Sequence, residues 1–398
     1  MKLRSLIYTL AFIIFAVPAF AFDPIELGEG KYLKIFYDGQ FGLTYRDTGT
    51  GVDSDEGTMN LNFRRNRLGF IGTYNDVLSF YFQMEYIENK VINPLSVSQD
   101  GNNQNFYVLD AQLRYEPLSW LKFRLGKFKH NLTRENLEGC FEPLTLDRSL
   151  YIATPYQTSR DIGVAVWGNF AANYLQYRLD VMEGKSGRAG EEYATASSLR
   201  YTARLQLSLL EDKETGYGVA GTYRGNKTVL TIGGAVQYEP TVAYADVANQ
   251  QDEKDYLAYS FDIFYEQPFG FGTVTASAGY VNMNFDDAYL GTNPSAGAMG
   301  QNGQKEGFYG KVGYMLPNLP LQFFARYDSF NFAALKSKNA WYYDQNITFI
   351  GAGANYYIDG QNIKVTFQYS NTSFDKEDAN DPHYQDFNTI ELYTQIRF

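Results

Sequence analysis

Apolar and polar residues alternate along most of this chain with a period of two. Within residues 31–46, Leu33 and Ile35 occupy one set of alternate positions, while Lys34 and Asp38 occupy the other. Successive side chains of a β-strand point to opposite faces, so this pattern predicts strands with one apolar and one polar face. No amphipathic helix of convincing length is predicted beyond the N-terminal segment.

Sixteen segments show this alternation. They span residues 31–46, 58–74, 77–90, 104–116, 120–129, 160–169, 173–184, 198–210, 228–239, 255–267, 272–285, 305–316, 320–330, 343–358, 362–371 and 387–398. Many have the length of about 9 to 11 residues that a tilted strand needs to cross a bilayer. We therefore predict an all-β fold, a 16-stranded antiparallel transmembrane β-barrel.

Short turns alternate with long connections between these segments. The turns are rich in Gly, Pro, Asn and Asp, and they lie at residues 74–76, 116–120, 268–272, 317–320 and 359–362. The long connections are polar, and the longest spans residues 130–159. Short periplasmic turns opposite long extracellular loops are typical of bacterial outer-membrane barrels. One connection departs from this pattern, because residues 211–227 are long where a short turn is expected.

The N-terminus predicts export from the cytoplasm. Lys2 and Arg4 precede an apolar run at residues 6–17, and Ala19-Phe20-Ala21 follows. This is the pattern of a secretory signal peptide that is removed after Ala21. We expect a signal peptide at residues 1–21 and a barrel at residues 22–398, located in the bacterial outer membrane.

Aromatic residues and the final strand support this assignment. The chain holds 34 Tyr and 30 Phe, and such rings suit the two lipid–water interfaces of a barrel. The last predicted strand ends on Phe398. It must pair with the first strand, because an open sheet edge does not persist in hydrocarbon. Its ending also resembles the C-terminal signature of outer-membrane assembly substrates.

Net charge excludes one class of function, and the cysteine count excludes one means of stabilisation. Without Lys2 and Arg4, the chain carries 32 basic and 45 acidic residues, a net charge of −13. A nucleic-acid binder that acts through bulk charge is therefore excluded.

Cys140 is the only cysteine, so no intrachain disulfide is expected. We expect it to be an inert loop cysteine, with a reactive thiol as the alternative.

Basic residues on the lipid face of a strand are costly, so they indicate which face points into the lumen. By this rule Arg64 and Lys127 fall on the outer face, near the extracellular ends of their strands. The candidate pore-lining and anion-binding residues are Arg65, Arg67, Lys122, Arg124, Arg178, Arg200, Arg204 and Arg326. Five more lumenal cations are Lys34, Arg46, Lys311, Lys364 and Arg397. Nine acids accompany these thirteen cations, namely Asp38, Glu85, Asp110, Asp161, Asp180, Asp262, Glu266, Asp328 and Glu391. An excess of positive charge in a narrow aqueous lumen predicts a preference for anions.

The connection at residues 130–159 is too long for a simple link between two strands. Its apolar residues include Leu137 and Phe141, which favour packing against other parts of the protein. We expect it to fold into the barrel and narrow it, with Arg134 and Arg148 as constriction residues. Folding outward as a cap is the alternative.

Three stretches resemble a known family: RRNRLGFIG at 64–72, LDAQLRYEPLSWLKFRLGKFK at 109–129 and RDIGVAVWG at 160–168. They are similar to the phosphate-selective porins (porin O/P) of Gram-negative outer membranes. The resemblance implies a trimeric, sixteen-stranded barrel with inward-folded loops and a basic lumen that guides phosphate or polyphosphate. The basic positions that match these motifs are Arg65, Arg67, Lys122 and Arg124.

We therefore predict an outer-membrane porin for passive diffusion of small hydrophilic or anionic solutes. A non-selective diffusion porin is one alternative, and a structural or adhesive barrel with a plugged lumen is another. An enzyme is not expected: only His130 and His383 are available to activate a nucleophile, and no catalytic residue, cofactor or metal site is predicted. Acidic runs at residues 53–57, 252–255 and 375–381 are predicted loop tips that either bind lipopolysaccharide through divalent cations or only confer solubility.

Overall fold

The computed structural model describes residues 23–51, 56–88, 104–149, 159–184, 198–246, 249, 251–284, 303–336, 341–375 and 385–398. The predicted signal peptide, the 150–158 part of the longest connection, His383 and residues 376–381 lie outside the described residues. The acidic run at 252–255 was predicted to be a loop tip, but it lies within a strand. Among the described residues, no helix is long and apolar enough to cross a membrane.

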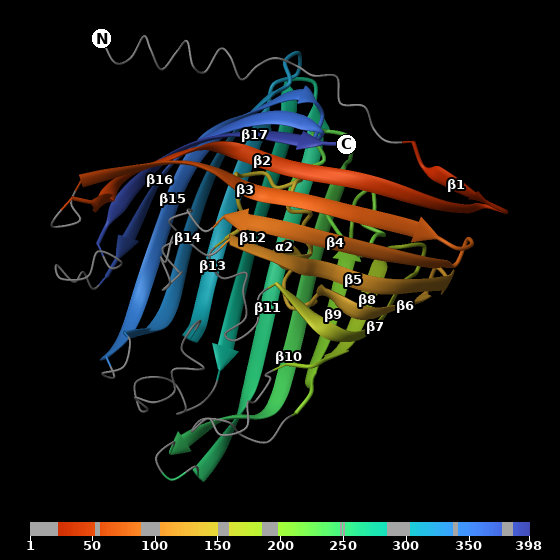
Figure 1. Ribbon diagram of the computed structural model, residues 1–398, viewed down its shortest axis with the longest axis horizontal. Helices are drawn as coiled ribbons and strands as arrows, with labels where there is room; N and C mark the ends of the chain where they lie inside the picture. The colour runs from red at the N-terminus through yellow and green to blue at the C-terminus, as the bar shows by residue number, and fades with distance from the viewer. Residues whose placement is uncertain are drawn as a thin grey trace.

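The described chain forms seventeen strands and one short helix (Figure 1). The strands are β1 (Ile25–Gly28), β2 (Lys31–Thr50), β3 (Glu56–Thr73), β4 (Leu78–Glu88), β5 (Gln104–Leu118), β6 (Leu121–Lys129), β7 (Arg160–Phe170), β8 (Leu175–Met182), β9 (Arg200–Ser208), β10 (Val229–Asp246), β11 (Gln251–Phe269), β12 (Gly272–Asn284), β13 (Gly303–Met315), β14 (Leu321–Lys336), β15 (Trp341–Asp359), β16 (Ile363–Phe374) and β17 (Phe387–Arg397). The helix is α2 (Arg134–Leu137).

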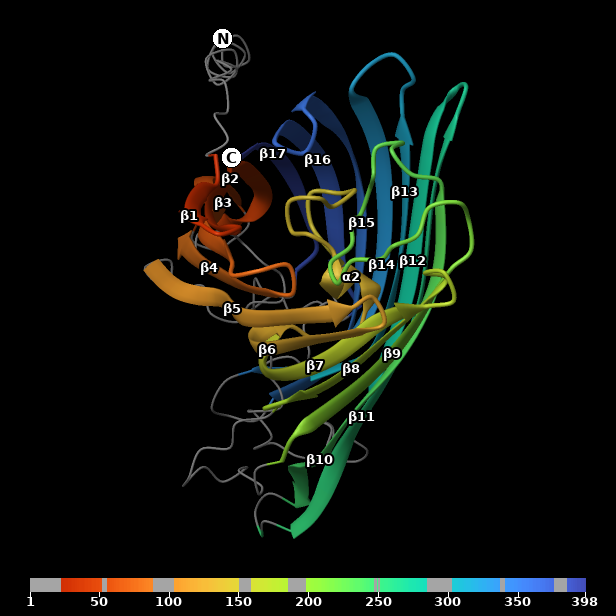
Figure 2. The same cartoon turned by 90° about the vertical axis from the view of Figure 1, so that its right-hand side faces the viewer.

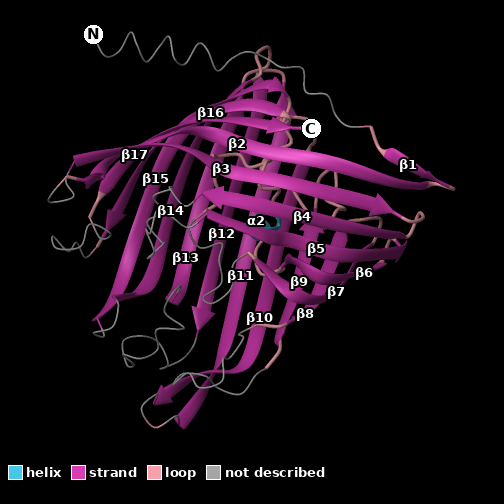
Figure 3. Cartoon of the chain, viewed as in Figure 1, coloured by secondary structure: helices cyan, strands magenta, loops and turns pink. Residues whose placement is uncertain are grey.

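Strands β2 to β17 form a closed antiparallel barrel (Figure 3). Each strand pairs with the next along the chain, and β17 pairs with β2 from Arg397↔Asp38 to Thr389↔Arg46. The predicted sixteen-stranded antiparallel barrel is therefore confirmed. Strand β1 was not predicted, and it adds a short hairpin to β2. The backbone of Phe398 exchanges two hydrogen bonds with Tyr37, of 2.7 and 3.0 Å, and so extends the β17–β2 pairing by one residue.

The two faces of each strand differ as the period-two pattern requires. In β9, Arg200 and Arg204 are buried, while Tyr201 and Leu205 are 47% and 58% exposed on the outer surface. Thr202 and the other inward positions of this strand are also polar and buried. The barrel therefore has an apolar outer surface and a polar interior, the reverse of a soluble domain.

A β-bulge in strand β3 changes the predicted orientation of one arginine. Gln40 of β2 pairs with Arg65, but the next residue, Phe41, pairs with Phe63, so Arg64 has no partner on β2. An extra residue in one strand shifts the alternation of its side chains. Arg64 consequently points into the barrel, and its predicted outward orientation is wrong. Lys127 keeps the outward orientation, and its Nζ donates to the exposed carbonyl oxygen of Val108.

Candidate functional site

Residues 130–149, here called the first inserted segment, lie inside the barrel (Figure 2). The segment follows β6 and contains helix α2. Thr133 caps this helix, because its Oγ1 accepts a hydrogen bond of 3.1 Å from the backbone N–H of Asn136. Almost all of its residues are buried, and the four residues of the helix are at most 1% exposed. The segment therefore fills part of the lumen.

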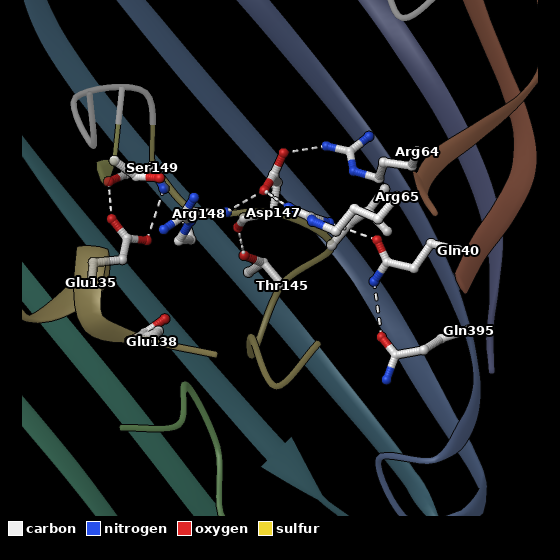
Figure 4. Close-up of polar contacts among 12 residues, drawn as sticks. Gln40, Arg64, Arg65, Glu135, Glu138, Thr145, Asp147, Arg148, Ser149 and Gln395 are labelled. Atoms are coloured by element: carbon white, nitrogen blue, oxygen red, sulfur yellow. Dashed lines mark hydrogen bonds and ion pairs between the residues drawn. The ribbon is translucent and has the colours of Figure 1, made fainter. Parts of the chain in front are cut away.

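The tip of the first inserted segment is bound to strand β3 through Asp147 (Figure 4). Arg65 donates to Asp147 at 2.8 Å, and Arg64 forms a second ion pair with the same carboxylate. Arg65 also donates to Gln40 at 2.6 Å. Burial acts to raise the pKa of Asp147, but Arg64 and Arg65 outweigh it and hold this pKa well below its usual range. The bulge in β3 is what allows two consecutive arginines to bind one loop carboxylate.

Further contacts carry the first inserted segment across the barrel to the opposite wall. Glu135 forms a buried ion pair with Lys311 of β13. The backbone carbonyl of Leu144 accepts a hydrogen bond of 2.8 Å from Asn355 of β15. The backbone carbonyl of Phe141 accepts a hydrogen bond of 2.9 Å from Gln395 of β17. The segment is thus held by strands on several sides of the lumen.

Residues 209–228, the second inserted segment, enter the lumen from the other end. They connect β9 to β10, at a position where the alternation of short turns and long loops predicts a short turn. Glu266 of β11 holds them, because its carboxylate accepts hydrogen bonds from Thr222 and from the backbone N–H groups of Tyr223 and Gly225, at 2.8 to 2.9 Å. This connection is therefore long because it folds into the barrel.

The two inserted segments meet inside the lumen. Arg134 donates to Glu138 at 2.7 Å and to Glu214 of the second inserted segment at 2.5 Å, and all three side chains are at most 2% exposed. The N–H of Gly139 donates to the carbonyl of Val219 at 2.8 Å, and Glu138 and Val219 form a parallel β-bridge. We call this contact the lumenal joint.

An apolar cluster explains why the two segments fold inward. Leu137 of the first segment and Val219 of the second pack with Trp167 of β7, and all three are at most 4% exposed. Tyr217 adds an edge-on ring contact with Trp167 at 5.4 Å between centroids. Burying each such side chain contributes about 1.5–3 kcal/mol. The sequence predicted an inward fold or an outward cap for residues 130–159, and the described part, 130–149, lies inside.

Eight of the thirteen predicted wall cations form ion pairs with described residues, five of them with predicted wall acids. The pairs with wall acids are Arg67–Glu85 at 2.6 Å, Arg204–Asp262 at 2.6 Å, Arg326–Asp328 at 2.9 Å, Arg397–Asp38 at 3.0 Å, and Arg200–Asp161. Lys122 lies 3.5 Å from Glu116. The Arg148 guanidinium donates to the backbone carbonyl of Asn136 at 3.3 Å. Paired charges add little net field, so the charged groups without ion-pair partners contribute most to the electrostatics of the lumen.

A cavity of about 530 Å³ lies between the lumenal joint and the wall formed by β2 to β7. Seven basic and four acidic side chains line it, an excess of three positive charges. They are Arg67, Arg114, Arg124, Lys129, Arg160, Lys227 and Arg397, with Asp38, Asp110, Glu142 and Glu214. All four acids form ion pairs: Asp38 and Glu142 with Arg397, Asp110 with Arg160, and Glu214 with Arg134.

Four of the seven cations form no ion pair with any described residue: Arg114, Arg124, Lys129 and Lys227. Arg114 and Arg124 are directly paired in the β5–β6 register, so two like charges lie side by side. Gln112 accepts from Arg124 at 2.6 Å and from Arg114 at 3.4 Å, and it supplies no charge. This arrangement attracts an anion, because the guanidinium fork binds oxyanions with two hydrogen bonds.

Arg178 extends this basic region along the wall. Its guanidinium carbon lies 4.9 Å from the centre of the Tyr217 ring, and that of Arg124 lies 3.9 Å from it. Arg178 donates to Gln176 at 2.8 Å, and one of its terminal nitrogens has no hydrogen-bond partner in the described part of the chain. Two guanidinium groups that lack carboxylate partners among the described residues therefore contact the same Tyr217 ring.

Sequence reasoning brought together some of these residues and missed others. It named Arg65, Arg67, Lys122 and Arg124 as the basic positions that match the family motifs. The structure places Arg67 and Arg124 on one cavity, whereas Arg65 binds the first inserted segment. Arg114 and Arg160 were not among the candidates. Strict alternation along β5 predicts that Arg114 points into the lumen, since it occupies the same set of alternate positions as the buried residues Asp110 and Gln112.

Comparisons with known proteins agree with this architecture. The sequence matches the family described as phosphate-selective porin O and P over residues 35–398. No curated protein sequence matches it. The solved structure of the outer membrane channel DcaP of Acinetobacter baumannii is similar, with 14% identity, a TM-score of 0.58, and coverage of 95% of this chain and 100% of that chain. The anion-selective porin from Comamonas acidovorans has 10% identity, a TM-score of 0.57, and coverage of 92% and 100%. OmpT of Vibrio cholerae in its trimer form has 12% identity, a TM-score of 0.51, and coverage of 93% and 100%.

At these identities the solved structures show a shared fold, and the family match carries the assignment. It covers nearly the whole chain, including β2 from residue 35 onward and all of β3 to β17. The apolar outer surface is then the lipid-facing surface of an outer-membrane channel. The chain belongs to the phosphate-selective porin O and P family.

Proposed function

We propose that this porin passes small hydrophilic solutes with a preference for anions. The observation that carries the proposal is the cavity beside the lumenal joint, whose seven basic and four acidic side chains leave an excess of positive charge. Field lines from unpaired charges stay within a narrow aqueous lumen, because lipid and protein surround it with a medium of low dielectric constant. Anions are therefore concentrated and small cations are repelled.

Selectivity in this proposal comes from a few residues. Paired wall cations such as Arg204 hold the wall together, but their acidic partners, here Asp262, cancel most of their charge. Arg114 and Arg124 have no carboxylate partner among the described residues, so a permeating anion serves as their counter-ion and leaves again. Such a mechanism involves no covalent step, and channels of this family are not enzymes.

The finer parts of the function are also proposals. The family description and the paired guanidinium groups support phosphate or a similar oxyanion as a favoured solute. The trimer form of OmpT supports a homotrimer for this chain. Export would use the signal peptide at residues 1–21. Acidic loop runs are candidates for contact with lipopolysaccharide through divalent cations.

A plugged structural barrel is a second candidate, and one observation favours it. The two inserted segments enter from opposite ends and join inside the lumen through buried contacts such as Arg134–Glu214. If they leave no continuous passage, the protein acts through its surface alone.

Single-channel recording separates the two candidates. Purified full-length protein is inserted into a planar bilayer in KCl, and discrete conductance steps are expected from a porin. Added inorganic phosphate is expected to reduce the chloride current in a saturable way, because it occupies the same cations. A bilayer without conductance steps, despite inserted and folded protein, would favour the plugged barrel. Conductance steps that phosphate does not affect would indicate a non-selective diffusion porin.

A further inference from the structure

We propose that Cys140 is a site of reversible covalent modification by small anionic disulfides that enter the cavity. This inference goes beyond the proposed anion preference, since it assigns a chemical reaction to a residue that permeation does not use. It rests on the position of the thiol, on the charges around it, and on a buried guanidinium with an unpartnered nitrogen.

Cys140 lies at the lumenal joint and lines the cavity of about 530 Å³. The preceding residue, Gly139, donates its N–H to Val219 of the second inserted segment. Cys140 is 5% exposed, so it is reached from the cavity and not from the outer surface. As the only cysteine of the sequence it has no intramolecular disulfide partner.

The charges around Cys140 favour its thiolate form. Lys129, Arg67 and Arg160 line the same cavity. Burial acts to raise the pKa of the Cys140 thiol, but Lys129 and Arg67 outweigh it and hold this pKa well below its usual range. A thiolate beside basic residues is the reactive form of cysteine, whereas a cysteine in apolar surroundings is inert. The expectation of an inert loop cysteine is replaced here by its alternative.

Arg124 indicates that the ligand is an anion. The residue is 9% exposed, lines the cavity, and carries an Nε atom without a hydrogen-bond partner among the described residues. Lys129 donates to the backbone carbonyl of Glu138 and forms no ion pair with a described residue. A carboxylate or sulfonate on the incoming disulfide therefore finds cations in the same cavity as the nucleophile.

The reaction is a thiol–disulfide exchange. The Cys140 thiolate attacks one sulfur of the incoming disulfide, a new S–S bond forms, and the original S–S bond breaks. The second half of the disulfide leaves as a thiolate, so charge and electrons balance without another oxidant. The resulting adduct carries one carboxylate in place of the thiolate charge, so the net charge of the site is unchanged, and its bulk occupies the cavity beside the lumenal joint. We expect it to reduce the anion current.

Two disulfides of similar size and opposite charge test the proposal: dithiodiglycolate, which is anionic, and cystamine, which is cationic. Full-length protein in detergent is treated with each, and the adduct is followed by intact-protein mass spectrometry. Each rate is divided by the rate of the same reagent with a free cysteine peptide. Dithiodiglycolate is expected to react about tenfold faster than cystamine on this scale, the size of a local electrostatic enrichment. Cys140→Ser is expected to give no adduct.

A bilayer recording adds a functional readout. Dithiodiglycolate is expected to lower the conductance of the wild-type channel, a reducing agent to restore it, and the Cys140→Ser channel to be unaffected by either reagent. No adduct on the folded protein, when the denatured protein reacts, would overturn the proposal. Equal relative rates for the two reagents would overturn it too. The mass measurement requires no ion flux, so this proposal and the anion preference can fail separately.

Discussion

Replacing Arg134 with methionine is expected to raise the single-channel conductance and its fluctuations. Arg134 pairs with Glu138 and Glu214, and none of the three is more than 2% exposed. Removing one partner of a buried ion pair costs about 3–5 kcal/mol, since it leaves an unpaired buried charge. In this variant two carboxylates remain, Glu138 on the first inserted segment and Glu214 on the second. Their mutual repulsion and the cost of keeping them away from water both favour moving the two segments apart. Planar bilayer recordings of the variant and the wild type measure this effect.

The matched control removes the carboxylates as well. Arg134→Met combined with Glu138→Gln and Glu214→Gln removes all three charges of this ion-pair cluster, and it is expected to bring the conductance back toward the wild-type value. Arg148→Gln is a second control, because the Arg148 guanidinium makes only long hydrogen bonds among the described residues, of 3.3 and 3.4 Å to Asn136. If Arg134→Met conducts like the wild type while its folding is intact, the lumenal joint does not limit permeation.

Replacing Arg114 and Arg124 with glutamate is expected to reverse the ion preference of the channel. The cavity then has five basic and six acidic side chains in place of seven and four, so its excess changes from three positive charges to one negative charge. Neither arginine forms an ion pair with a described residue, so the full change acts on permeating ions. Reversal potentials under a KCl gradient measure it.

Lys127→Glu is the matched control for this double variant. Lys127 belongs to the same strand as Arg124, but it faces outward and donates to Val108. The same replacement there is expected to leave the reversal potential nearly unchanged. An unaltered anion preference in Arg114→Glu/Arg124→Glu would place the selective charges elsewhere in the lumen.

The barrel itself could be predicted from sequence because its signal is local. Each strand needs only its own alternation to show two faces, and β9, with Arg200 and Arg204 inward and Tyr201 and Leu205 outward, is a clear example. The number of strands follows from counting such segments. Closure follows from the cost of an open edge in lipid.

The orientation of Arg64 could not be predicted in this way. Alternation within β3 assigns Arg64 and Arg65 to opposite faces, and only the register with β2 shows that one residue is extra. A bulge is a property of two strands that are paired, so a single strand pattern does not contain it. The anchor for Asp147 was missed for the same reason.

The lumenal joint is a long-range feature as well. Leu137, Val219 and Trp167 belong to three separate parts of the chain, and they meet only once the barrel has closed. The excess length of residues 211–227 was visible in the sequence, but its destination was not. Ion pairing within the lumen also depends on the order and register of the strands, because Arg204 of β9 pairs with Asp262 of β11 across the intervening strand β10. A count of wall charges therefore could not identify the unpaired ones.

The sign of the wild-type reversal potential tests the central claim most directly. That claim is that cations without carboxylate partners in the described part of the chain, chiefly Arg114 and Arg124, determine which ions pass. Full-length protein in a planar bilayer, with KCl more concentrated on one side, is expected to show a reversal potential of the sign that chloride permeation produces. A reversal potential of the sign that potassium permeation produces would contradict the account.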